Sequence, residues 1–93
     1  MSDQDDRLND LRKQIDTLDE ELLRVLSERM NAAREIGSYK KSHGLDLTDS
    51  ERMRAVLETQ LSRADQAGLP HEFVQELYEV IYKHTIAVEA DTP

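Results

Sequence analysis

A long helical pattern from Asp5 to about Ser42 constrains the fold of this chain more than any other feature. Apolar residues recur there in two series with seven-residue spacing, and no proline or glycine interrupts them before Gly37. The first series is Leu8, Ile15, Leu22 and Ile36, and the second is Leu11, Leu18, Val25 and Ala32. This periodicity predicts one uninterrupted helix with a buried apolar face.

Positive charges interrupt this apolar face. Arg29 occupies the position of the first series between Leu22 and Ile36, and the flank beside the face begins with Arg12 and ends with Lys40. Arg29 and Lys40 are separated by about 16 Å along an ideal helix and lie on one side of it. Two long side chains can close that gap on one small anionic molecule.

The length of this helix predicts a dimer. Its roughly 38 residues would span about 60 Å, whereas a compact monomer of this size has a radius of gyration of about 12 Å and cannot bury so long a face. In an antiparallel pair centred near Leu23, the partner's Arg12 falls level with residue 34, between Arg29 and Lys40. We therefore expect a symmetric homodimer with two cationic pockets, each formed by both chains.

Composition narrows the possible ligands. The net charge of −8 argues against nucleic acid or an anionic membrane as a partner, and cations held inside an acidic protein indicate a small anionic ligand. The chain has no cysteine, and its histidines share no ligand spacing, so we expect no metal site. No apolar run reaches the length of a membrane span, and the start MSDQDD is unlike a signal peptide, which favours the cytoplasm.

Two shorter helices are expected after the long one. The sequence Thr48-Asp49-Ser50-Glu51 fits a capping box and predicts the start of a second helix, which Gly68-Leu69-Pro70 should end. A third helix should come next, with two adjoining apolar stripes. The sequence thus predicts a single all-α domain over residues 1–93, with helices at about 5–42, 49–67 and 71–89.

The charged residues, taken together, resemble those of the all-helical chorismate mutase family. The matching pattern is Leu11-Arg12-x-x-Ile15-Asp16-x-x-Asp19-x-x-Leu22-Leu23, then Glu28-Arg29, Ile36-Gly37-x-x-Lys40 and Asp49-x-x-Arg52. The resemblance covers about Leu8 to Glu89. It implies an intertwined three-helix homodimer that rearranges chorismate to prephenate, in the shikimate pathway and aromatic amino acid biosynthesis, without metal, cofactor or covalent intermediate.

The resemblance also implies a role for each matching residue. The partner's Arg12 and Arg29 would bind the two carboxylates of the substrate and hold its reactive conformation. Lys40 matches the position that stabilises negative charge developing on the ether oxygen. Three further positions match places near the substrate: Arg52, the backbone of Asp49 and the hydroxyl of Thr85.

Two residues depart from the family pattern. Met53 stands where many bacterial relatives have a glutamate, and it cannot replace that carboxylate as the acceptor for a ring hydroxyl. Glu89 stands where many relatives have a glutamine that donates to the ether oxygen, so it must be protonated to help. Activity should then fall as the pH rises, and Glu89→Gln should flatten the profile. An ionised Glu89 would instead pair with a substrate ammonium.

These departures leave other functions open. Isochorismate-pyruvate lyase, which has the same fold, also lacks the acid at the position of Met53. A 4-amino-4-deoxychorismate mutase would suit a carboxylate at Glu89. A heptad pattern of this length is also compatible with a dimeric scaffold that catalyses nothing, in which the arginines fix the register.

Four of the candidate residues also have a purely structural interpretation. Arg29 could pair with a glutamate across the dimer, Lys40 could cap its own helix, and Met53 could belong to the core. Glu89, in the last turn of its helix, could be solvated. Among the other cations, those that we expect on solvated faces include Arg7, Arg24, Arg34, Lys41, Arg54, Arg63 and Lys83.

Overall fold

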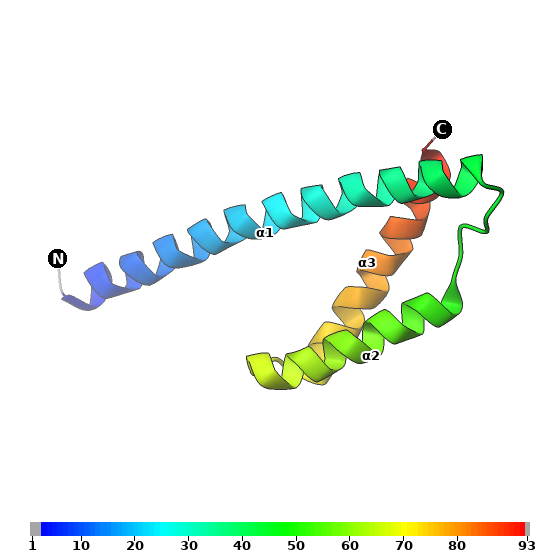
Figure 1. Ribbon diagram of the computed structural model, residues 1–93. Coiled ribbons are helices and arrows are strands. Elements are labelled where there is room, and N and C mark those ends of the chain that lie inside the picture. The colour runs from blue at the N-terminus through cyan, green and yellow to red at the C-terminus, as the bar shows by residue number, and fades with distance from the viewer. Residues whose placement is uncertain (1–2, 93) are drawn as a thin grey trace. The chain divides into compact units, whose positions relative to one another are not determined.

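The computed structural model describes residues 3–92 as three α-helices, with no strand in that range (Figure 1). The helices are α1 (Asp3–Ser42), α2 (Ser50–Ala67) and α3 (His71–Asp91). The all-α class and the three-helix architecture are therefore confirmed.

The chain divides into two compact units, the first reaching Asn31 and the second beginning at Ala32. In the described range, none of the helices has an apolar stretch long enough to cross a membrane.

The first unit consists of the α1 turns up to Asn31. Helix α1 begins at Asp3, two residues before the predicted start. Its apolar face is not buried within one chain, because the side chains of the heptad series keep 40% to 57% of their surface accessible. These side chains are Leu8, Leu11, Ile15, Leu18, Leu22 and Val25. A continuous apolar surface of this kind is typical of a site of association.

In the second unit, α2 has a capping residue at each end. Each capping residue forms hydrogen bonds with backbone groups at that end of the helix. Asp49 stays extended (φ −139°, ψ 91°) and its carboxylate accepts a hydrogen bond from the Arg52 backbone N–H at 3.0 Å. Helix α2 therefore starts one residue later than predicted, with Asp49 as its N-cap. Gly68 ends the helix in the left-handed region (φ 73°), where glycine is favoured, and its N–H bonds the carbonyls of Ala64 and Asp65.

Helix α3 contacts α2, and one of its two apolar stripes is more covered than the other. The more covered stripe is buried at Val74 and half-buried at Tyr78, Ile81, Thr85 and Val88. The adjoining stripe remains exposed, with accessible fractions of 52% at Phe73, 42% at Leu77 and 56% at Val80. Helix α3 also continues two residues beyond the predicted end.

The last turns of α1 and α3 touch through their backbones. A Cβ atom added to Gly37 would lie 2.5 Å from the carbonyl oxygen of Glu89 and 2.7 Å from its Cα. Only glycine permits this approach, because any side chain would overlap the backbone of α3. Lys40 and Lys41 come about one turn after Gly37, so the close contact places both lysines beside the C-terminal end of α3.

Candidate active site

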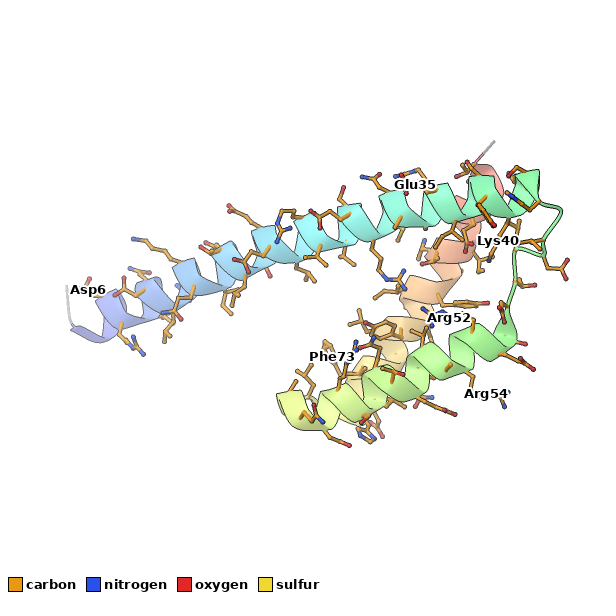
Figure 2. All side chains as sticks on the ribbon, viewed as in Figure 1. Asp6, Glu35, Lys40, Arg52, Arg54 and Phe73 are labelled. Atoms are coloured by element: carbon orange, nitrogen blue, oxygen red, sulfur yellow. The ribbon has the colours of Figure 1, made fainter. Side chains whose placement is uncertain are left out.

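An ion pair between α1 and α3 forms the centre of the candidate site. The ammonium nitrogen Nζ of Lys40 lies 2.9 Å from Oε1 of Glu89, and the two side chains are 20% and 5% exposed. Lys40 also donates a hydrogen bond to the carbonyl of Leu47 at 2.8 Å. Its ammonium therefore joins the end of α1, the α1–α2 connection and the end of α3. Figure 2 shows Lys40 on the side of α1 that faces α3.

Glu89 is the only charged residue that is buried among those the structure describes, with 4% of its surface accessible. The solvated interpretation of Glu89 was therefore wrong, because the approach of α1 at Gly37 covers this turn of α3. No described donor makes a hydrogen bond to Glu89 Oε1. The Lys40 ammonium thus lies within ion-pair distance of this oxygen, but the angles of the contact are not those of a hydrogen bond. The oxygen keeps the capacity to bind a further polar group.

Thr85 shares the helix face of Glu89. It precedes Glu89 by one helical turn, and residues four apart lie on the same side of a helix. Its side chain is half-buried, and its hydroxyl donates to the Ile81 carbonyl at 2.8 Å.

The start of α2 carries the other candidates of the second unit. The Asp49 carboxylate is engaged as the helix cap, and its carbonyl accepts from the Met53 N–H at 3.0 Å. Arg52 is exposed and Met53 is half-buried, which agrees with the packing interpretation of Met53. Figure 2 shows Arg52 and Arg54 projecting from opposite sides of α2. A substrate role for Asp49, Arg52 or Met53 stays a prediction.

Arg12 and Arg29 belong to the first unit. Arg12 is exposed and Arg29 is half-buried. Their convergence on Lys40 requires a second chain for Arg12, so the shared pocket also stays a prediction. The structure thus brings together Lys40 and Glu89, and it places Thr85 on the same face as Glu89.

Two residues that shape this site received no role in it from the sequence: Gly37, which stands in the family pattern, and Lys41. Lys41 is exposed, as expected, but its ammonium donates hydrogen bonds to the Ala90 carbonyl, at 2.6 Å, and to the Thr92 carbonyl. The C-terminal carbonyls of α3 attract a cation because they carry partial negative charge. A signal for Gly37 was present, since glycine inside a long helix often marks a close backbone approach.

The arrangement supports electrostatic catalysis on an oxygen that gains negative charge. An ammonium in partly buried surroundings stabilises such an oxygen more strongly than it would in water. The neighbouring carboxyl group can donate a hydrogen bond when it is protonated and can only accept when it is ionised. The protonation of Glu89 therefore decides whether it assists or opposes Lys40.

The fold and the site together define a small all-helical domain in which a buried carboxylate and a lysine join two helix ends. The chain belongs to the chorismate mutase type II family, whose family model matches residues 11–90. The family recognised from the charged residues is therefore confirmed.

Three relatives illustrate the similarity. The chain is 30% identical over 82 residues to the T-protein of Haemophilus influenzae, covering 88% of this chain and 22% of that protein. It is 34% identical over 87 residues to the bifunctional chorismate mutase/prephenate dehydratase of Aquifex aeolicus, covering 90% of this chain and 24% of that protein. It is 32% identical over 82 residues to the 4-amino-4-deoxychorismate mutase of Streptomyces venezuelae, covering 88% of this chain and 80% of that protein. The chain thus spans about a quarter of the first two relatives.

Proposed function

We propose that this chain is a chorismate mutase that rearranges chorismate to prephenate. The observation that carries the proposal is Lys40, a half-buried ammonium at the family position, fixed between Leu47 and Glu89. Membership of the chorismate mutase type II family supports the reaction class. A pathway role in aromatic amino acid biosynthesis and a cytoplasmic location belong to the proposal as well.

In this reaction the substrate's ether C–O bond breaks while a new C–C bond forms, and all electrons move within the substrate. Negative charge develops on the ether oxygen. An ammonium group has three N–H donors, and one of those of Lys40 is used by Leu47. Another would donate to the ether oxygen, and a donor of this kind contributes about 10²- to 10³-fold to kcat.

Substrate binding is proposed to require a second copy of the chain. The exposed heptad face in the first unit supports association, because it extends along α1 from Leu8 to Val25. In an intertwined homodimer the partner's Arg12 and Arg29 would bind the two substrate carboxylates by two-point contacts. Arg52 would add positive potential, and Thr85 and the backbone at Asp49 would contact the substrate.

A second candidate is mutase activity on 4-amino-4-deoxychorismate. It is favoured by the similarity to the Streptomyces venezuelae enzyme, which this chain matches over most of that protein's length. For this substrate an ionised Glu89, whose Oε1 lies beside Lys40 and accepts no hydrogen bond from a described residue, would bind the substrate amine. Among the residues that the structure describes, none of the contacts given above specifically favours isochorismate-pyruvate lyase or a non-catalytic scaffold.

One assay separates these functions. The protein is incubated separately with chorismate, isochorismate and 4-amino-4-deoxychorismate, and the products are separated by chromatography. We expect prephenate from chorismate at the highest kcat/KM, with Lys40→Met as the inactive control and Arg54→Met as the active one. Turnover of the amino substrate alone, or pyruvate release from isochorismate alone, would reassign the chain. Absence of turnover and of any prephenate-induced rise in Tm would indicate a scaffold.

A further inference from the structure

The C-terminal end of α3 lacks a favourable charge of its own. Its last turn, Val88-Glu89-Ala90-Asp91, contains two acidic residues and no basic residue. Helix carbonyls at a C-terminus carry partial negative charge, so acidic side chains there are unfavourable and a nearby cation is stabilising. Without help from another element, this turn would fray, and Glu89 lies within it.

Helix α1 supplies the missing cation. Nζ of Lys41 donates to the Ala90 carbonyl at 2.6 Å and to the Thr92 carbonyl. The hydroxyl of Thr92 donates to the Val88 carbonyl at 2.8 Å. Free carbonyls of the last turn are thus satisfied by one side chain of α1 and one from the end of α3 itself.

Three contacts from the C-terminal part of α1 hold the residues around Glu89. Gly37 lets the α1 backbone touch the Glu89 backbone, Lys40 pairs with the Glu89 carboxylate, and Lys41 binds the carbonyls after it. Lys40 and Lys41 are adjacent in the sequence, so a shift of the last α3 turn against Lys41 also moves the Glu89 carboxylate relative to Lys40. The backbone contact alone does not prevent such a shift, because it does not hold the residues after Glu89.

We infer that Lys41 is a positioning residue that fixes the last turn of α3 and thereby holds the Glu89 carboxyl group at Lys40. Lys41 itself acts on backbone carbonyls and needs no contact with a substrate. The effect on catalysis rests on the proposed function, whereas the effect on the helix end does not. The conservative replacement Lys41→Arg keeps the charge and donors, and Lys41→Met keeps most of the aliphatic side chain without the charge.

The test compares Lys41→Met and Lys41→Arg with the wild type. Lys83→Met serves as the matched control, because Lys83 is an exposed lysine of α3. Amide hydrogen exchange of residues 88–92 reports on the helix end, and kcat and KM report on the site. For Lys41→Met we expect exchange about tenfold faster in these residues and kcat about tenfold lower, with KM within about twofold. Lys41→Arg should recover most of both losses.

The inference is overturned if Lys41→Met leaves exchange at residues 88–92 unchanged, changes KM alone, or behaves like Lys83→Met in kcat. Failure of the proposed function has a different signature, since the wild type would then convert none of the three substrates. In that case exchange alone decides whether Lys41 fixes the helix end. Faster exchange limited to residues 88–92 would support the positioning role, and unchanged exchange would refute it.

Discussion

Two oppositely charged side chains, Lys40 and Glu89, meet at the proposed site and act on each other's charge. While Glu89 is ionised it attracts the Lys40 ammonium and reduces the positive potential available to a doubly negative substrate. A protonated Glu89 no longer pairs with Lys40 as a charge, and it can itself donate to the ether oxygen. Catalysis should therefore depend on the charge of one carboxyl group.

This dependence predicts a pH profile with a definite sign. The neutral form of Glu89 assists the reaction, so kcat should fall as the pH rises and the carboxyl group ionises. In Glu89→Gln the donor is present at every pH, and the profile should flatten. The measurement is kcat against pH for both proteins. A wild-type profile as flat as that of Glu89→Gln would contradict the role of Glu89.

At the scale of the helices, the contact between the last turns of α1 and α3 places Lys40 beside Glu89. Gly37→Ala should destabilise the protein, because the new methyl group would lie 2.5 Å from the Glu89 carbonyl oxygen. The cost of overpacking, about 1–3 kcal/mol, exceeds the gain of about 0.5–1 kcal/mol from replacing a helical glycine. Urea unfolding measures the change, and Lys83→Ala should alter stability by less than about 0.5 kcal/mol. A more stable Gly37→Ala protein would exclude the close contact.

The N-cap of α2 is a second feature at this scale. Removing the Asp49 carboxylate in Asp49→Ala should lower the free energy of unfolding by about 1 kcal/mol, because the Arg52 N–H loses its acceptor. Asp49→Asn keeps an acceptor oxygen and should cost much less. Thermal unfolding of the two variants provides the comparison. Equal losses in both would indicate that the charge, and not the cap, is responsible.

At the scale of the whole chain, the features that depend on local pattern could be predicted from the amino-acid sequence. The heptad series and the Gly68-Leu69-Pro70 stop predicted three helices, since helix periodicity and breaking residues act locally. The burial of Glu89 and the contacts of Lys41 could not be predicted, because both depend on where α3 crosses α1. The observed helix ends differ from the predicted ones by up to two residues for a similar reason. Caps such as Asp49 depend on the local backbone conformation.

The assembly of the site from two chains is also a property of the whole molecule. If the partner's Arg12 completes the pocket that contains Arg29 and Lys40, a variant lacking Arg12 and a variant lacking Lys40 can complement each other. A mixed dimer of Arg12→Ala and Lys40→Ala has one pocket with both residues intact and one pocket lacking both. A mixture of Arg29→Ala and Lys40→Ala cannot do this, because these two residues come from the same chain.

The most direct measurement is therefore the chorismate mutase activity of mixed variants after co-refolding. Arg12→Ala and Lys40→Ala, each nearly inactive alone, should together recover about a quarter of the wild-type activity, because half of randomly assorted dimers are mixed and each has one intact pocket. The Arg29→Ala and Lys40→Ala mixture should stay inactive. If the first mixture forms dimers and shows no recovery, or if both mixtures recover equally, the pocket is not shared between two chains.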